Sequence, residues 1–362
     1  MISTFLRNFG RIQAKITQPL VSDGFIFSRR TVRTSFVRSK SSRTVDLIMP
    51  TKRRFIIDTD CGLDDAQAIL MALSQGVDVV GITTCSGNTG VDQVCKNVLR
   101  VLKLANRLEI PVFKGTSASL LRDTPACDAY HGKDGLGDVP DSEAPDSRLV
   151  KEEHAVNALV RMINQNAGEV TLVCLGPLTN IALAIQMDPS IGSKVKECHI
   201  MGGNYEAKGN ITVSGEFNFR ADPEAANIVL NQLGCPVTLV CWELCLKYSL
   251  SWDYYDNLVG NGSQVGHFIK TCEKNITAKM RHEQSMEMYM CADQFSMATA
   301  LDNSVAMETL NCFATVELHG EFSRGQLVLD HSGMLGHKPN VDIVISINME
   351  KFKSVLEKSI EI

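Results

Sequence analysis

No run of apolar residues in this sequence approaches the roughly 18 that a membrane-spanning helix needs. No internal repeat occurs at the periods typical of solenoid proteins. These two absences argue against a helical membrane protein and against a repeat array. What remains is a chain of 362 residues with 44% apolar content, which is sufficient for one large α/β domain or two small ones.

Cysteine pairs with metal-binding or redox spacing are also missing. The twelve cysteines include no Cys-x-x-Cys pair, and Cys85, Cys174 and Cys241 lie in apolar, strand-like runs. A free cysteine in such a run behaves as a small buried hydrophobe. Cys241 and Cys245 have i,i+4 spacing, but no cluster of histidines nearby completes a zinc site. The pattern indicates reduced thiols in an intracellular protein.

The first fifty residues lack the continuous apolar segment of a secretory signal and hold seven arginines and two lysines against Asp23 and Asp46. This segment resembles a mitochondrial transit peptide, and the alternative is a disordered extension with Met49 as a second start. We therefore divide the chain into a basic extension, 1–49, and a main domain, 50–362, and predict a cytoplasmic or mitochondrial location. The net charge of the whole chain is −5 although the extension is basic, so the main domain must be acidic. An acidic domain argues against a nucleic-acid partner.

Strands and helices alternate along most of the main domain, which is the signature of parallel βαβ units. We predict an α/β fold with a single open, mostly parallel, Rossmann-like sheet flanked by helices. The expected strands after the first are 77–85, 110–113, 169–175, 195–201 and 236–241, and the expected helices between them are 91–107, 151–165, 178–187 and 222–233. Residues 251–300 are expected to be mainly helical, and the chain should end with a few strands and a helix over 349–358.

The most informative segment places Asp58, Asp60, Asp64 and Asp65 within eight residues. An apolar run typical of a buried parallel strand precedes them, and an amphipathic helix with acids in its first turn follows. The carboxylates should therefore lie at the carboxyl end of a strand, where open α/β sheets bind ligands. Their mutual repulsion requires a cation, and oxygen ligands suit Ca²⁺ or Mg²⁺ rather than Zn²⁺. We predict a divalent metal site that is used for hydrolysis.

Polar side chains and sharp turns also follow later strands. These features are Asn88 after Ser86-Gly87, Gly176-Pro177 in Leu175–Asn180, Met201-Gly202-Gly203-Asn204, the segment Glu216–Ala225, and Asp293. Because the carboxyl ends of parallel strands meet at one edge of a sheet, we expect all of them to gather near the four aspartates.

The ordered set of motifs resembles the inosine-uridine preferring nucleoside hydrolase family. The motifs are Asp-x-Asp-x-x-x-Asp-Asp, Gly-Asn, His-Gly-x-Asp-Gly-Leu-Gly, Gly-Pro-Leu-Thr-Asn, Met-Gly-Gly and Glu-Phe-Asn-x-x-Ala-Asp-Pro-Glu-Ala. The resemblance runs from about residue 54 to the end of the chain. It implies Ca²⁺-dependent hydrolysis of the N-glycosidic bond of ribonucleosides, in a homodimer or homotetramer.

The resemblance also assigns roles to residues of this chain. It implies that Ca²⁺ is held by Asp60, Asp65, the backbone carbonyl of Leu175, and Asp293. It implies that the nucleoside is contacted by Asp64, Asn88, His131, Met201, Asn210, Glu216, Asn218 and Asp293. Asp60 would take the proton from a metal-bound water, and His131 would act near the base. A Ca²⁺ ion with 6–8 oxygen ligands would keep about three positions open for that water and two ribose hydroxyls.

One departure from the family pattern concerns the departing base. Many members have a histidine directly before the last metal-binding aspartate, and this chain has Ala292 there. His131, His282 or Tyr289 could then protonate the base, or an aromatic such as Trp242 or Trp252 could stack on it. This departure also leaves open a non-catalytic, Ca²⁺-dependent nucleoside- or ribose-binding homologue.

The same residues also allow another enzyme class and several purely structural roles. Asp58-Thr59-Asp60 also occurs in phosphatases of the haloacid dehalogenase type, although Asp64-Asp65 fits that family poorly. We expect Asp58 to bond to the backbone and to polar neighbours, Asp222-Pro223 to begin a helix, the run Met286–Met290 to pack in a helix, and both tryptophans to lie in the core.

Overall fold

The computed structural model describes residues 52–123 and 129–362, which belong to one compact unit, Pro50–Ile362. The extension 1–49, with the predicted transit peptide, lies outside the described residues. In the part of the chain that is described, no helix is both long enough and apolar enough to cross a membrane.

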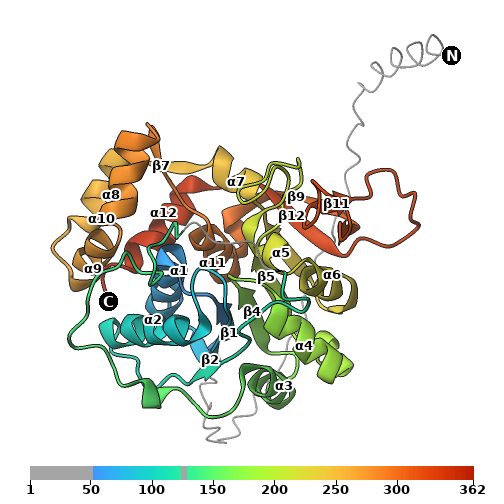
Figure 1. The fold of residues 1–362 in the computed structure, drawn as a ribbon, viewed down its shortest axis with the longest axis horizontal. Coiled ribbons are helices and arrows are strands. Elements are labelled where there is room, and N and C mark those ends of the chain that lie inside the picture. Colours follow the sequence, from blue (N-terminus) through green and yellow to red (C-terminus); the bar gives the residue numbers. More distant parts are fainter. Residues whose placement is uncertain (1–51, 124–128) are drawn as a thin grey trace, which may run out of the picture. The chain divides into compact units, whose positions relative to one another are not determined.

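An eight-stranded sheet forms the centre of the unit, with the strand order β3-β2-β1-β4-β5-β6-β12-β9 (Figure 1). All neighbouring strands are parallel except β12 and β9, which are antiparallel. Its strands are β1 (Arg54–Thr59), β2 (Asp78–Thr84), β3 (Val112–Lys114), β4 (Val170–Cys174), β5 (Glu197–Met201), β6 (Val237–Val240), β9 (Ala306–Cys312) and β12 (Val341–Ile347). The predicted α/β class with an open, mostly parallel sheet is confirmed.

Helices cover both faces of this sheet. The helices whose side chains join the core on one face are α1 (Leu63–Ser74), α2 (Val91–Leu104), α7 (Trp242–Lys247), α8 (Trp252–Val259), α9 (Gln264–Cys272), α10 (Lys274–Ala278), α11 (Asp293–Leu301) and α12 (Met349–Lys358). Those on the other face are α3 (Ala155–Gln165), α4 (Thr179–Met187), α5 (Phe217–Ala221) and α6 (Pro223–Gln232). Phe55 and Ile57 of β1 pack on the first face and Ile56 on the second, which explains why the centre of the strand is a continuous apolar run.

Two small antiparallel sheets complete the unit. One pairs β7 (Ser249–Ser251) with β8 (Met288–Met290), and the other pairs β10 (Ala314–Val316) with β11 (Leu327–Leu329). The run Met286–Met290 therefore ends in a strand, and the prediction that it packs in a helix is wrong. Its alternating side chains explain the difference, because Tyr289 is buried while Met288 is exposed.

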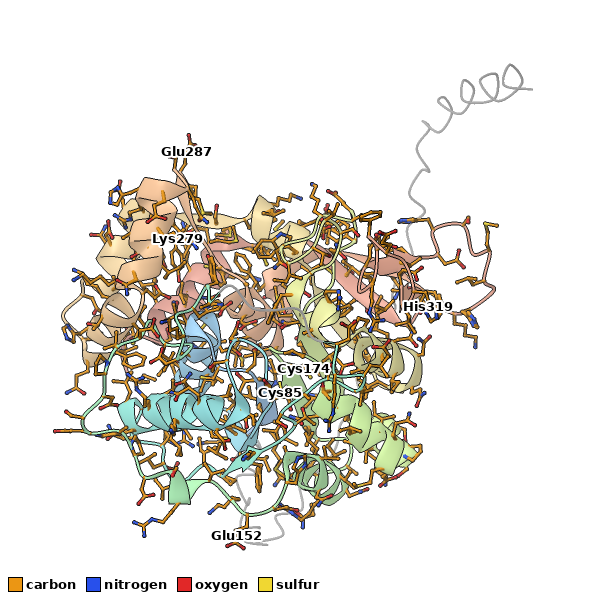
Figure 2. All side chains as sticks on the ribbon, viewed as in Figure 1. Cys85, Glu152, Cys174, Lys279, Glu287 and His319 are labelled. Carbon is orange, nitrogen blue, oxygen red and sulfur yellow. The ribbon has the colours of Figure 1, made fainter. Side chains whose placement is uncertain are left out.

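The cysteines of the described residues are free thiols, as the absence of paired spacing predicted. Cys85 and Cys174 lie inside the unit, at the ends of two central strands (Figure 2). Burial raises the pKa of both thiols well above the ordinary value, so they remain neutral. They act as small apolar residues in the core.

Candidate active site

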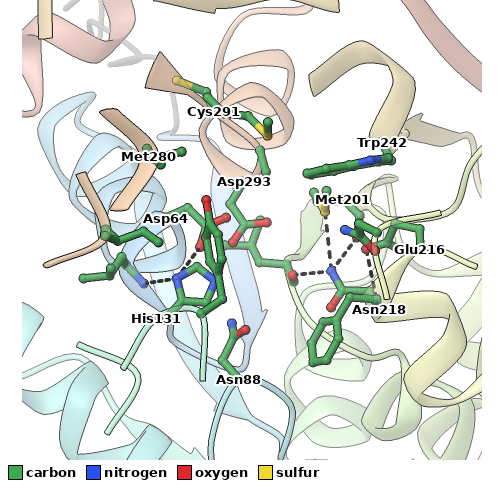
Figure 3. A pocket seen from close by; sticks show the side chains of 18 of the residues that line it. Asp64, Asn88, His131, Met201, Glu216, Asn218, Trp242, Met280, Cys291 and Asp293 are labelled. Carbon is green, nitrogen blue, oxygen red and sulfur yellow. Dashed lines mark hydrogen bonds and ion pairs between the residues drawn. The ribbon is translucent and has the colours of Figure 1, made fainter. Parts of the chain in front are cut away.

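The predicted acidic cluster lies where β1 ends and α1 begins. Among the described residues, Asp64, Asp65 and Asp293 bring one carboxylate oxygen each within 4.8 Å of the others. Asp64 and Asp65 belong to the first turn of α1, and Asp293 opens α11. The backbone N–H of Gly62 donates to Asp65 Oδ2 at 2.8 Å, which fixes that carboxylate at the start of the helix. Figure 3 shows Asp64 and Asp293 side by side at the centre of the cavity.

Asp60 lies beside this group of three but is not one of its members. Its Oδ2 accepts the backbone N–H of Asn88 at 2.8 Å. Two glycines make room for its carboxylate, because a Cβ on Gly87 would lie 2.0 Å from Asp60 Oδ2 and one on Gly176 would lie 2.7 Å from Oδ1. The loops after β2 and β4 thus form a backbone cradle around this side chain.

The electrostatics of these carboxylates suit a divalent cation. Burial and the charges of its neighbours raise the pKa of Asp65 to about 6 and raise the pKa values of Asp60 and Asp293 well above the ordinary value. Asp60 Oδ1 and Asp64 Oδ1 are buried without a hydrogen-bond partner. Buried, unsatisfied carboxylate oxygens are costly unless a cation pairs with them, and Ca²⁺ takes such oxygens as ligands. The donor set therefore fits a hard metal ion.

Asp58 differs from the other aspartates of the motif. It is buried and accepts hydrogen bonds from Thr83 Oγ1 at 2.6 Å and from Asn180 Nδ2 at 2.9 Å. The expectation that it bonds to polar neighbours agrees with these contacts. It ties β1 to β2 and to the start of α4.

Asn218 links three predicted site residues across the sheet edge. Its Nδ2 donates to the backbone carbonyl of Leu175 at 2.9 Å and to that of Met201 at 3.1 Å. Glu216, the N-cap of α5, places Asn218 by accepting its backbone N–H at 2.9 Å, and it also accepts the N–H groups of Gly203 and Phe219. Burial raises the pKa of Glu216 to about 7. Asn210, on an exposed loop, also lines the cavity.

His131 contacts the acidic cluster rather than the far end of the cavity. Its Nδ1 accepts the backbone N–H of Leu63 at 3.2 Å and lies 3.7 Å from Asp64 Oδ1. Because Nδ1 accepts, the ring hydrogen of the neutral form is on Nε2. His131 therefore sits at the N-terminus of α1, beside Asp64.

Most of the predicted site residues form one wall, the polar wall, of a cavity of about 360 Å³, whereas Asp58, Asp60 and Asp65 do not line it. The polar wall consists of Asp64, Asn88, His131, Leu175, Met201, Asn210, Glu216, Asn218 and Asp293. A second wall comes from residues 273–292, and we call it the 273–292 wall. Its members are Glu273, Ile276, Met280, Gln284, Met286, Tyr289, Met290, Cys291 and Ala292. Figure 3 shows Met280 and Cys291 on the side of Asp293 away from Glu216 and Asn218.

Two expectations about the departing base need correction. Trp242 is half-buried and lines the cavity, so it is not a core residue (Figure 3). His282 is exposed and is absent from the cavity lining, which removes it as a candidate to protonate the base. Trp252 packs edge-on against Tyr255 and Tyr289 and donates to the backbone carbonyl of Met286, as a structural residue does.

Sequence reasoning missed Glu273, a buried carboxyl in the cavity wall. A signal was present, because Ile269 and Ile276 flank it at i−4 and i+3, so Glu273 shares a helix face with buried apolar residues. An acid in that position is almost never buried without partners or a function.

Comparisons with known proteins agree with the geometry. A family model described as "Inosine-uridine preferring nucleoside hydrolase" matches residues 55–354. The pyrimidine-specific ribonucleoside hydrolase RihB of Escherichia coli (strain SE11) is 32% identical over 312 residues, which cover 85% of this chain and 97% of that protein. Among solved structures, an inosine-guanosine nucleoside hydrolase matches with a TM-score of 0.78 and 32% identity, over 85% of this chain and 99% of that one.

A plant enzyme extends the comparison. The nucleoside hydrolase PpNRh1 matches with a TM-score of 0.79 and 29% identity, covering 85% of this chain and 98% of its own. The predicted enzyme class, a hydrolase of N-glycosyl bonds, is confirmed by these relatives. The chain belongs to the inosine-uridine preferring nucleoside hydrolase family.

Proposed function

We propose that this chain uses Ca²⁺ to hydrolyse the N-glycosidic bond of ribonucleosides, releasing the free base and ribose. The observation that carries the proposal is the group formed by the half-buried Asp64 and the buried Asp65 and Asp293, with Asp60 beside it, next to a cavity of about 360 Å³. The cavity is large enough for a small polar ligand. Its polar wall suits a sugar, and the 273–292 wall suits a flat, largely apolar base.

Asp60, Asp65, Asp293 and the carbonyl of Leu175 would hold the metal ion. When bound, Ca²⁺ would lower the pKa of a water molecule and orient the vicinal hydroxyls of the ribose. Asp60 would take the proton of that water, because its carboxylate keeps an oxygen, Oδ1, that has no hydrogen-bond partner within the described residues. General-base catalysis of this kind contributes about 10²–10⁴-fold to a rate.

The polar wall binds and orients the sugar. Asp64 accepts the 2′-hydroxyl, Asn218 and Asp293 meet the 3′-hydroxyl, and Asn210 and Glu216 meet the 5′-hydroxyl. Asn88 and Met201 lie beside the ring, and His131 lies next to Asp64, with Nδ1 3.7 Å from Oδ1. As the glycosidic bond breaks, the ribose gains positive charge, which the surrounding carboxylates stabilise.

The proposal places catalysis in the domain 50–362 and includes a homodimer or homotetramer. It does not fix the base, because the relatives are named as pyrimidine-specific, inosine-guanosine and purine-preferring enzymes. Ala292 is the observation that favours the second candidate, a binding protein that holds nucleosides without cleaving them.

The test is the release of free base and ribose from a panel of purine and pyrimidine ribonucleosides, with and without a chelator. We expect equimolar base and ribose from at least one ribonucleoside, loss of this activity in chelator, recovery with Ca²⁺, and slow reaction of 2′-deoxynucleosides. Asp60→Asn should lower kcat by about 10²–10⁴-fold. Asp78→Asn is the control, because Asp78 is exposed and begins β2 at the opposite edge of the sheet.

Full activity in chelator, or in Asp60→Asn, would rule out the proposed mechanism. Saturable, Ca²⁺-dependent binding of ribonucleosides without release of base over a long incubation would establish the binding protein instead.

A further inference from the structure

Two side chains of the 273–292 wall, Glu273 and Tyr289, meet two polar side chains behind it, and the roles given under the proposed function use none of the four. We call Gln67, Tyr255, Glu273 and Tyr289 the Glu273 network. Glu273 Oε1 accepts from Gln67 Nε2 at 2.5 Å and from the Tyr289 hydroxyl at 3.0 Å, and Oε2 accepts from the Tyr255 hydroxyl at 2.6 Å. Gln67 Nε2 also donates to the Tyr289 hydroxyl at 2.9 Å. These contacts join α1, α8, β8 and the turn between α9 and α10.

The Glu273 network reaches the cavity at the end where a base would lie. Glu273 and Tyr289 both line the cavity, and of the described residues that line the 273–292 wall, Glu273 is the one carboxylic acid. The sugar-binding groups occupy the polar wall, so the base of a bound nucleoside must face the 273–292 wall. A proton source in this wall would be close to the leaving group.

The surroundings of Glu273 favour its neutral form. Burial, with a smaller contribution from the charge of Asp64, raises its pKa to about 7, although the hydrogen bonds from Tyr255, Tyr289 and Gln67 lower it. Burial and the nearby Glu273 also raise the pKa of Tyr289 well above the ordinary value, so its hydroxyl keeps its proton.

The hydrogen-bond directions change when Glu273 is protonated. Its carboxyl can then donate to the Tyr289 hydroxyl, which already accepts from Gln67 Nε2. Both lone pairs of that hydroxyl are then occupied, and its own hydrogen no longer has Glu273 as its acceptor. Neutral Glu273 therefore turns Tyr289 from a donor to Glu273 into a donor to whatever the cavity holds.

We propose that Tyr289 is the catalytic acid that protonates the departing base, with Glu273 and Gln67 as positioning residues that hold its hydroxyl and resupply its proton. This assignment rests on the proposed function and deepens it. It supplies the chemistry that Ala292, in place of a histidine, cannot supply.

The proton and electron movements balance. The N-glycosidic bond breaks and its electron pair stays on the base nitrogen, which takes the Tyr289 proton while Tyr289 takes the Glu273 proton. Water adds its oxygen to C1′ of the ribose and gives a proton to Asp60. Return of that proton through solvent to Glu273 restores the enzyme, and the net reaction is nucleoside plus water to base plus ribose.

The competing explanation is that the Glu273 network only ties helices together. A structural role and a proton-donating role differ in their dependence on the leaving group. A nucleoside base is a poor leaving group and needs a proton, whereas 4-nitrophenolate leaves without one. A 4-nitrophenyl β-ribofuranoside therefore bypasses the proposed step and keeps the sugar contacts.

The experiment compares kcat and KM of the full chain on its best ribonucleoside and on 4-nitrophenyl β-ribofuranoside. For Tyr289→Phe and Glu273→Gln we expect kcat on the ribonucleoside to fall by about 10²-fold or more, with KM and kcat on the nitrophenyl riboside changed less than about threefold. In wild type, kcat on the ribonucleoside should fall as pH rises through about 7, and Glu273→Gln should lose this fall. Tyr254→Phe is the matched control, because its hydroxyl bonds to Glu357 on the surface.

Each outcome decides the question. An equal fall on both substrates would assign the network a structural role and overturn the proposal, as would unchanged kcat on the ribonucleoside. Wild type that cleaves the nitrophenyl riboside but no ribonucleoside would also overturn it. Wild type that cleaves neither substrate would overturn the proposed function itself, which is a separate result.

Discussion

The aspartates of this site differ in whether their carboxylate oxygens have hydrogen-bond partners. Asp58 is satisfied by Thr83 and Asn180, whereas Asp60 and Asp64 each keep a buried oxygen without a partner. The sequence showed four aspartates within eight residues, but not which of their oxygens already had hydrogen-bond partners. That distinction depends on residues far along the chain, such as Asn180, which no local pattern reveals.

Glu216 shows how burial makes one residue a source of pH-dependent stability. Its pKa rises from the ordinary 4.5 to about 7 in the folded chain. An acid with a raised pKa holds its proton in the folded state between these values while the unfolded chain has lost it. Its contribution to the free energy of unfolding is therefore complete below about pH 4.5 and is lost as pH rises through about 7.

We predict that Glu216→Gln, in chelator, is less stable than wild type at pH 5, because the amide gives up an acceptor for the backbone N–H groups. The difference in the free energy of unfolding should become smaller towards pH 7.5, because wild type loses stability as Glu216 gives up its proton and the variant does not. The change should not exceed about 1.4 kcal/mol per pH unit. Urea unfolding at several pH values measures it. Glu206→Gln, at an exposed position, is the control. Parallel pH curves for wild type and Glu216→Gln would contradict the assignment of the pKa.

At the scale of elements, the strands buried on both faces were predictable and the exposed ones were not. The run that begins at Phe55 is apolar because helices cover both faces of β1. β9 is an edge strand whose central residues Met307, Glu308 and Thr309 are exposed, so it has no apolar run to detect. α5 has five residues, and it is defined by the Glu216 cap rather than by an apolar period.

The loop that carries His131 also depends on an element that is distant in sequence. Arg100, on α2, is almost fully buried and pairs with Asp134 at 3.7 Å and Asp141 at 3.3 Å, and its Nη2 donates to the carbonyl of Val139 at 3.1 Å. These three contacts fasten the loop after His131 to the helix layer.

We predict that Arg100→Lys raises KM for the nucleoside several-fold with a smaller change in kcat, because a lysine cannot span the three contacts and the loop loosens. Steady-state kinetics measure this, and hydrogen exchange of residues 129–141 should accelerate. Lys96→Gln, on the exposed side of the same helix, should change neither. Unchanged exchange in Arg100→Lys would show that the loop is held by other contacts.

At the scale of the whole molecule, the sequence predicted which distant segments come together, but not which of their side chains bond to each other. Asp65, Asn88, Leu175 and Asn218 converge because the parallel strands before them end at one edge of the sheet. Asp293 joins them from the start of α11, which follows β8 of a small antiparallel sheet. The Glu273 network was not predictable in this way, because it depends on how α8, α9 and β8 pack against α1. Topology follows from pattern, whereas helix packing on a sheet follows from side-chain shape.

The acidic cluster should make the stability of the domain depend on metal. Burial, together with the charges of neighbouring carboxylates, raises the pKa values of Asp60, Asp65 and Asp293, so folding without a cation makes their charged forms unfavourable. A ligand that binds only the folded chain stabilises it by about 2.7 kcal/mol at 100 times its dissociation constant. We therefore predict that Ca²⁺ raises the midpoint of thermal unfolding of chelator-treated protein, and that the rise grows with Ca²⁺ concentration. Asp293→Asn should lose most of this rise, and Asp253→Asn, an exposed control on α8, should keep it. If Ca²⁺ does not change the unfolding midpoint of the wild type, the prediction that these aspartates bind Ca²⁺ is wrong, whatever the activity of the chain.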